Sequence, residues 1–405
     1  MSQHIQFLDK GTITSAKGFQ AGATFAGMKT FAEDKYDLGI VYSTRPCTCA
    51  GTFSQNEVRS FSIRITEDNV RKGNMRAVVA NSGVANAVVG DQGRKDAQEM
   101  ARLAAQQLGL QPDQMGVLST GLIGVELPMA VIRSGLPKIK LSEAGGNLFA
   151  RSIMTTDTAP KEAAVAYQSG GRTVVIGGVA KGSGMIHPNM ATMLSVLATD
   201  AAVDAVFLRG ALKRAVDRSF NMISVDGDTS TNDTVLLLAN GGAGSPTVAA
   251  GSPEAAIFQE ALDLICVHLA KAIVRDGEGA SKVFEVRIEG ARNEAEARMG
   301  ARTISNSNLV KTAVHGNDPN WGRIVAALGR SGAHVEEEKL SLYINGVCIM
   351  EGGLPIPFFK DAVIQQMRQP EVSFRVHLGL GDGTATAWGC NLSEAYVTFN
   401  SAYTT

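Results

Sequence analysis

The sequence is poor in aromatic residues and cysteine, and it has no long apolar run. Aromatic residues make up 6% of its 405 residues, and the five cysteines form an odd, dispersed set. Such a set is typical of free thiols in a reducing compartment, which predicts a cytoplasmic protein. Without 18 consecutive apolar residues we expect no transmembrane helix, and residues 1–21 lack the apolar core of a secretory signal.

Neither positive nor negative residues are in excess. The formal net charge is −1, with no block of like charges, so neither a nucleic acid nor an anionic membrane is expected as a partner. The six histidines are dispersed and Cys47-Thr-Cys49 lacks the spacing of a zinc site, so we predict no metal. The run Gly379-Leu-Gly-Asp-Gly383 leads into a strand rather than a helix, which argues against a nucleotide cofactor.

Glycine is abundant, at 44 residues. Apolar residues recur with the spacing of a helix in some segments and with that of a strand in others. The patterns predict a mixed α/β (α+β) fold, and the length suffices for two domains. Asp200 is expected to be the N-cap of a helix that runs to about residue 220, and Gly109 the C-cap of another. Asn345-Gly346 predicts the turn of a β-hairpin. The main expected strands and helices are strands 76–83, 116–124, 172–180, 193–198, 235–238 and 283–288, and helices 96–108 and 254–274.

The most informative stretch runs from Lys181 to Asp200. A loop rich in glycine and broken by proline leads directly into an apolar strand, and Ala191-Thr192 lies at the junction. The Thr192 hydroxyl there can add to the preceding carbonyl and cleave the chain. Cleavage leaves a free amine beside the hydroxyl, where it can act as the general base. A plain surface loop is the alternative interpretation.

Two other polar segments have two interpretations each. The run from Asp226 to Asp233 resembles the start of a calcium loop, but Thr231 and Leu237 stand where an EF-hand needs glycine and glutamate. It is either a set of turns or the floor of a site. The run Ser119-Thr-Gly121 is either a glycine turn or a pair of donors, the Thr120 hydroxyl and the Gly121 N–H, for an oxyanion.

Taken together, five segments resemble the ornithine acetyltransferase family of arginine biosynthesis, over nearly the whole chain. The segments are Thr155–Lys161, Lys181–Asp200, Ser219–Thr234, Gly316–Arg323 and Tyr396–Thr405. The resemblance implies that family's fold and N-terminal-nucleophile self-cleavage at Ala191-Thr192. The products would be an α chain, 1–191, and a β chain, 192–405, each associated with a mixed α/β domain, in an α2β2 heterotetramer.

The resemblance also implies the reaction. Acetyl would pass from N-acetyl-L-ornithine to L-glutamate by a ping-pong mechanism through acetyl-Thr192, without a cofactor. Some members load acetyl from acetyl-CoA, and the sequence leaves open whether this chain does. By motif position, Thr192 is the nucleophile and Thr120 and Gly121 form the oxyanion hole. The residues that would line the substrate pocket are Thr158, Lys181, Thr192, Glu278, Asn400 and Thr405.

This chain departs from the family pattern at Val84, where a second asparagine is usual, and at Cys47 and Cys49. Among the implied residues, Lys181 is expected to pair with the α-carboxylate that both substrates share, and Glu278 with the ornithine ammonium. The competing prediction is an N-terminal-nucleophile aminopeptidase or amidase, which would pass the acyl group to water. A binding protein that retained the fold would not cleave itself.

Overall fold

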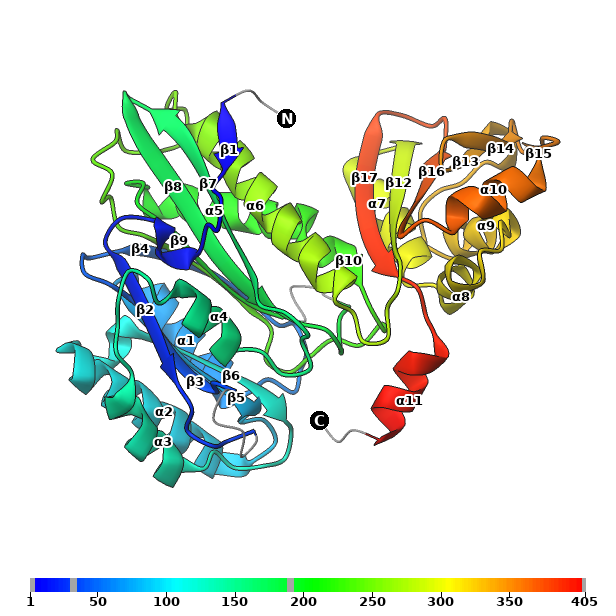
Figure 1. The fold of residues 1–405 in the computed structure, drawn as a ribbon. Coiled ribbons are helices and arrows are strands. Elements are labelled where there is room, and N and C mark those ends of the chain that lie inside the picture. The colour runs from blue at the N-terminus through cyan, green and yellow to red at the C-terminus, as the bar shows by residue number, and fades with distance from the viewer. Residues whose placement is uncertain (1–3, 30–34, 188–192, 403–405) are drawn as a thin grey trace.

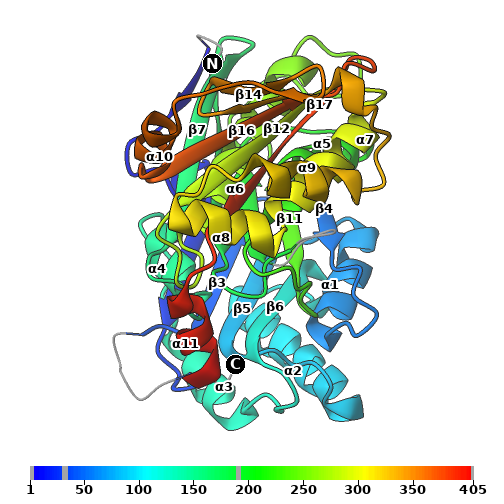
Figure 2. The ribbon, with the colours of Figure 1, turned by 90° about the vertical axis from the view of Figure 1, so that its right-hand side faces the viewer.

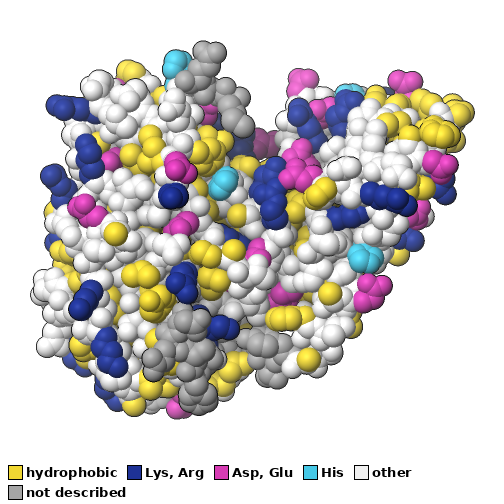
Figure 3. Space-filling view, in the orientation of Figure 1, with side chains coloured by type: hydrophobic (Ala, Val, Ile, Leu, Met, Phe, Trp, Pro, Cys, Tyr) yellow, Lys and Arg dark blue, Asp and Glu magenta, His cyan; other side chains and the backbone are white. Residues whose placement is uncertain are grey.

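The computed structural model describes residues 4–29, 35–187 and 193–402, which form three β-sheets with helices packed on them. The ribbon has a larger body and a smaller C-terminal lobe, and the last helix, α11 (Glu394–Ala402), runs from that lobe back towards the body (Figures 1 and 2). In the space-filling view a notch separates the two parts at the top of the molecule (Figure 3). The predicted mixed α/β class is confirmed.

The central sheet of the body has six strands in the order β1-β7-β8-β9-β11-β4. Its strands come from both sides of the expected cleavage bond, since β9 pairs with β8 and β11 pairs with β4. Helices α5 (Ala205–Arg218) and α6 (Ala255–Arg275) pack against this sheet. The strands are β1 (Ile5–Phe7), β4 (Thr48–Phe53), β7 (Lys161–Ser169), β8 (Arg172–Lys181), β9 (Leu194–Thr199) and β11 (Thr234–Ala239).

A four-stranded sheet, in the order β2-β3-β5-β6, forms the next layer of the body. Apolar side chains of both sheets meet in one buried cluster, and a second cluster joins the four-stranded sheet to α2 and α3. The elements are β2 (Phe19–Thr24), β3 (Leu38–Ser43), β5 (Ala77–Val84), β6 (Met115–Leu122), α1 (Phe61–Lys72), α2 (Gly90–Leu108), α3 (Met129–Gly135) and α4 (Gly146–Ser152).

The smaller lobe is built on a seven-stranded sheet in the order β10-β17-β12-β16-β13-β14-β15. Helix α7 packs on β12 and β17. The elements are β10 (Ile223–Ser224), β12 (Val283–Ala291), β13 (Ser341–Ile344), β14 (Val347–Glu351), β15 (Leu354–Pro355), β16 (Glu371–His377), β17 (Gly383–Cys390), α7 (Glu294–Ser305), α8 (Asn308–Gly316), α9 (Trp321–Gly329) and α10 (Lys360–Met367).

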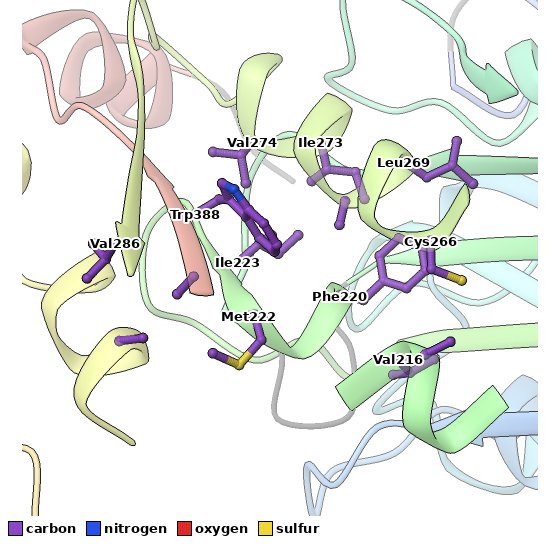
Figure 4. Close-up of a cluster of buried hydrophobic side chains, with 14 of the residues drawn as sticks. Val216, Phe220, Met222, Ile223, Cys266, Leu269, Ile273, Val274, Val286 and Trp388 are labelled. Atoms are coloured by element: carbon purple, nitrogen blue, oxygen red, sulfur yellow. The ribbon is translucent and has the colours of Figure 1, made fainter. Parts of the chain in front are cut away.

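One apolar cluster joins the lobe to the body (Figure 4). Strand β10 belongs to the lobe's sheet although it follows α5 in the chain, so the segment between them carries buried side chains from one part to the other. Phe220 lies beside Cys266 of α6, and Trp388 of β17 lies beside Val274, near the end of that helix. Burying side chains of this size contributes roughly 1.5–3 kcal/mol each, which holds the two parts together.

Two of the predicted local signals are confirmed. Gly109 is the C-cap of α2, in the left-handed conformation at a φ of 66°. Asn345 and Gly346 link β13 to β14 with φ values of 47° and 82°, as a primed hairpin turn requires.

The prediction that Asp200 caps a helix is wrong. Helix α5 begins at Ala205, and its N-cap is Asp204, four residues after Asp200. The side chain of Asp204 accepts hydrogen bonds from Val206 N and Phe207 N. Asp200 is buried, and its carboxylate accepts from Lys17 N at 3.0 Å and Val175 N at 2.8 Å. Its charge therefore satisfies backbone groups of the body instead of a helix end.

In the described residues, no helix combines the length and apolar character that crossing a membrane requires.

Candidate active site

A cavity of about 860 Å³ lies where the ends of several elements of the body meet α11. Six of the residues predicted for the site contribute to its wall, although they are spread over almost the whole chain. They are Thr120, Gly121, Thr158, Lys181, Glu278 and Asn400. Ala191, Thr192 and Thr405 lie outside the described residues. Met193, the residue that follows Thr192, lines the same cavity.

Thr120 and Gly121 lie near the end of β6, opposite Ser82 and Gly83 of β5. The backbone is crowded there: a Cβ added to Gly121 would lie 2.2 Å from the carbonyl carbon of Gly83. Gly121 also has a φ of +126°, which L side chains rarely adopt. Glycine is therefore required at this position, and its main chain lies open to the cavity without a side chain in the way.

Lys181 ends β8 and is almost fully buried. Its Nζ donates to Thr155 Oγ1 at 2.7 Å and to Thr120 Oγ1 at 3.4 Å. Burial lowers the pKa of Lys181, while the nearby Asp157 carboxylate opposes this shift by stabilising the ammonium. The ammonium thus lies between the predicted oxyanion residue and the Thr155–Lys161 segment.

A buried ion network, which no sequence signal indicated, lies close to Lys181. Lys161 Nζ is 2.6 Å from Asp157 Oδ1 and 2.5 Å from Asp276 Oδ2. Asp157 also accepts from Gly182 N at 2.7 Å. Burial favours a higher pKa for Asp157, but the charges of Lys181 and Lys161 overcome it and hold the pKa at about 2.

The same network orients Thr158. Its backbone N donates to Asp276 Oδ2 at 3.0 Å, and its hydroxyl also donates to this carboxylate. Asp276 follows the last residue of α6, and its carbonyl accepts from Ser183 Oγ at 2.6 Å. The start of β7, the loop after β8 and the end of α6 are therefore tied together at the cavity wall.

Glu278 faces the cavity from the turn after α6, with its side chain largely buried. Asn400 of α11 donates to Glu278 Oε2 at 2.9 Å. A Cβ on Gly184 would lie 2.4 Å from this carboxylate, so the glycine gives the loop room to pass. Tyr396, which was not predicted, lines the same region, and burial together with the Asp226 and Glu278 carboxylates raises the pKa of its phenol.

The Asp226–Asp233 run contributes to the cavity wall and also fixes neighbouring segments. Asp226 accepts from Met185 N at 2.6 Å and Ile186 N at 2.8 Å, so it fixes the loop that leads to the expected cleavage bond. Asn232 donates to Ser119 O at 2.8 Å, which ties the run to β6. Several of its side chains also line the cavity: Asp226, Asp228, Ser230, Thr231, Asn232 and Asp233.

Lys29 is a further cavity residue that no sequence signal indicated, since an isolated lysine in a loop has no distinguishing pattern. Its Nζ donates to Met154 O at 3.0 Å and to Ser82 Oγ at 3.2 Å, and burial lowers its pKa to about 8. The departures from the family pattern are elsewhere. Val84, Cys47 and Cys49 are buried, and none of them is among the residues that line the cavity.

Comparison with known proteins gives one family and relatives of full length. The model of the ArgJ family matches residues 20–405. The "Arginine biosynthesis bifunctional protein ArgJ" of Symbiobacterium thermophilum is 50% identical over 397 residues, 98% of this chain and 99% of the relative. The protein of that name from Dehalococcoides mccartyi is 48% identical over 405 residues, 100% of both chains. A crystal structure of the Bacillus halodurans protein, 43% identical, has a TM-score of 0.50 and covers 51% of this chain and 98% of that chain.

His187, in the loop that leads to the expected cleavage bond, makes the free energy of unfolding depend on pH. Burial lowers the pKa of His187 from 6.5 to about 4, and Arg302 and Lys311 act in the same direction. Between these values the folded protein binds fewer protons than the unfolded chain. The free energy of unfolding should therefore fall by about 2–3 kcal/mol, to order of magnitude, as the pH drops from 6.5 to 4.

Urea unfolding of wild type and His187→Gln at several pH values tests this. The loss between pH 6.5 and 4 should be smaller in His187→Gln, while His377→Gln, which changes an exposed histidine, should retain it. If the free energy of unfolding falls equally in wild type and His187→Gln, His187 is not the group responsible.

Proposed function

The chain belongs to the ArgJ family, and from this membership we propose that it transfers acetyl from N-acetyl-L-ornithine to L-glutamate through an acetyl ester on Thr192. One observation carries the proposal. The six described residues that the family pattern names line a single cavity, and Met193, beside Thr192, lines it too. These residues come from positions 120 to 400 of the chain, so it is the fold that brings them around one space.

The proposal begins with self-cleavage. The Thr192 hydroxyl adds to the Ala191 carbonyl, the peptide C–N bond breaks to give an ester, and water then hydrolyses the ester. This leaves a carboxylate on Ala191 and a free α-amine on Thr192. The Bacillus halodurans chain supports this division. The match includes 98% of that chain but only 51% of the present one. Either product of cleavage would be close to half of the present sequence.

The products, 1–191 and 192–405, would stay together without a covalent link. Strand β9 of the second piece pairs with β8 of the first along six residues, from Leu194 opposite Lys181 to Thr199 opposite Ile176. Strand β11 pairs with β4 of the first piece in the same way. Cutting the chain just before β9 leaves these ladders intact. We propose that two such pairs form the α2β2 heterotetramer.

The free α-amine of Thr192 is the proposed base. Its pKa is near ~8, so a useful fraction is neutral at cytoplasmic pH and can take the hydroxyl proton. The oxygen then attacks the acetyl carbon of N-acetylornithine. When the C–N bond breaks, the proton goes to the departing ornithine amine, and an ester remains. The glutamate amine attacks this ester, and Thr192 regains its hydroxyl.

The negative charge on the acetyl oxygen needs donors at both steps. Thr120 and Gly121 are proposed for this purpose, because they line the cavity from β6 and the Gly121 main chain has no side chain to shield it. Loss of one such donor lowers the rate by a factor that corresponds to about 3 kcal/mol. Lys181, whose Nζ is 3.4 Å from Thr120 Oγ1, adds positive charge beside this group.

Two charged side chains fit the substrates. Lys181 is proposed to bind the α-carboxylate that N-acetylornithine and glutamate share, while Glu278 is proposed to bind the side-chain ammonium of ornithine. Thr158, Asn400 and Thr405 would complete the pocket. The hydrogen bond from Asn400 to Glu278 supports this assignment, because it holds the carboxylate at the cavity wall.

The curated relatives are named bifunctional, which supports a second activity, and we propose acetyl-CoA as a second acetyl donor to glutamate. The five cysteines are unpaired thiols, which supports a reducing, cytoplasmic setting. The alternative function, an N-terminal-nucleophile aminopeptidase or amidase, would transfer the acyl group to water. Acetyl release that is independent of glutamate would favour that alternative.

The intact mass of purified protein tests the cleavage. We expect two polypeptides that meet at Ala191-Thr192 in the wild type and one full-length chain in Thr192→Ala, because the variant lacks the attacking hydroxyl. Thr199→Ala, which removes a threonine hydroxyl seven residues further along, should be cleaved like the wild type. A single uncut wild-type chain would refute the proposed maturation.

Steady-state kinetics of Glu278→Gln test the ammonium pairing. The amide keeps the size of the side chain and an acceptor for Asn400, but it removes the charge. We expect the KM for N-acetylornithine to rise about tenfold or more, since charged hydrogen bonds contribute ~1.5–3 kcal/mol, with little change in the KM for glutamate. Glu57→Gln, an exposed glutamate outside the cavity, is the control. An unchanged KM for N-acetylornithine would eliminate the pairing.

A further inference from the structure

A second cavity, of about 350 Å³, is lined in part by the loop that leads to the expected cleavage bond. Arg298 and Arg302 of α7, Arg330 of the turn after α9, and His187 contribute to its wall. No aspartate or glutamate is among the described residues that line it, and it shares no lining residue with the acetyl-transfer cavity. It is a separate, positively charged space.

The carboxylates near Arg298 are also engaged by other cations. Arg298 lies 3.6 Å from Asp217 Oδ1, but that carboxylate also binds Lys213 Nζ at 2.5 Å. Glu294 is close enough for Arg298 to help lower its pKa, but its carboxylate is paired with Arg218 at 3.0 Å. Arg302 is partly buried, and desolvation together with the charge of Arg298 lowers its pKa, which reflects positive charge held in a poorly solvated place.

The histidine in the wall does not add to this charge at neutral pH. Because its pKa is lowered to about 4, His187 is neutral there, and its Nε2 lies 3.3 Å from an Arg302 guanidinium nitrogen. A neutral ring nitrogen can accept from the guanidinium and so fix its direction. Thr303 and Asn306 provide uncharged polar groups, and Met299 provides an apolar wall.

We propose that this cavity binds a small organic anion through a carboxylate or phosphate group held by Arg298, Arg302 and Arg330. Guanidinium groups present planar pairs of N–H donors that match both kinds of oxyanion, and they are more weakly hydrated than lysine ammonium groups. The volume suffices for an anion with a short carbon body beside Met299. This site goes beyond the proposed acetyl transfer and does not depend on it.

Hydrogen bonds connect the wall of this site to the loop that leads to the expected cleavage bond and to the Asp226–Asp233 run. His187 N donates to Asp228 O at 3.1 Å, and Asp228 lines the acetyl-transfer cavity. Asn306 accepts from Ser224 Oγ at 2.8 Å, just before the Asp226 run. An anion bound here would therefore contact His187 and Asn306, which are hydrogen-bonded to Asp228 and Ser224. It would not compete for the proposed substrate positions.

Binding is tested on the purified wild-type protein by calorimetry and thermal unfolding at constant ionic strength. Inorganic phosphate probes the phosphate form of the ligand and glutarate the carboxylate form, with chloride as the reference. We expect saturable binding of at least one of them, with a matching rise in unfolding temperature. Arg330→Gln and Arg302→Gln should each weaken it about tenfold or more. Arg292→Gln, an exposed arginine outside the cavity, should leave it unchanged.

Arg330 is exposed, so its variant keeps the test decisive if Arg302→Gln does not fold. Equal binding in wild type and Arg330→Gln would overturn the proposal, as would the absence of saturable binding of both anions. Binding that is lost in Lys181→Ala but retained in the arginine variants would assign the anion to the acetyl-transfer cavity, and would also overturn it.

Discussion

The candidate site depends on one buried ammonium, that of Lys161, held between the carboxylates of Asp157 and Asp276. These three residues belong to the start of β7, the segment before it and the end of α6, and the backbone of Gly182 joins them from the end of β8. Removing one partner of such a buried group leaves an uncompensated charge and costs about 3–5 kcal/mol. The network therefore holds in place the segments that bear Thr158, Lys181 and Glu278, none of which is sequence-adjacent to another.

The second constraint is the sheet that both halves of the chain share. A peptide bond cut at residue 191 would lie immediately before β9, whose ladder with β8 and β11 is independent of that bond. The loop before it is fixed by Asp226 through Met185 and Ile186. The strand pairing next to that bond would therefore persist after a cut, which is what a nucleophile generated by self-cleavage requires.

Much of the fold was predictable because apolar periodicity and turn chemistry are local: the Gly109 cap and the Asn345-Gly346 turn follow from their own residues. The assignment of Asp200 as a cap failed because its carboxylate is used by distant backbone groups, which no local pattern reveals. Residue chemistry indicated Thr192, Thr120 and Gly121 but left a plain loop and a glycine turn as alternatives. The other site positions came from the family resemblance alone, because no local pattern marks them. Lys29 and Arg330 were missed because their partners lie far away in the chain and meet them only in the folded protein.

The central claim is that Thr192 carries the acetyl group, and trapping that ester tests it most directly. Wild-type protein is incubated with N-acetylornithine in the absence of glutamate, quenched in acid and analysed by peptide mass spectrometry. The account predicts one added acetyl group on the peptide that begins with Thr192, and its loss when glutamate is supplied. An acetyl group on another residue, or release of ornithine only when glutamate is present, would contradict the account.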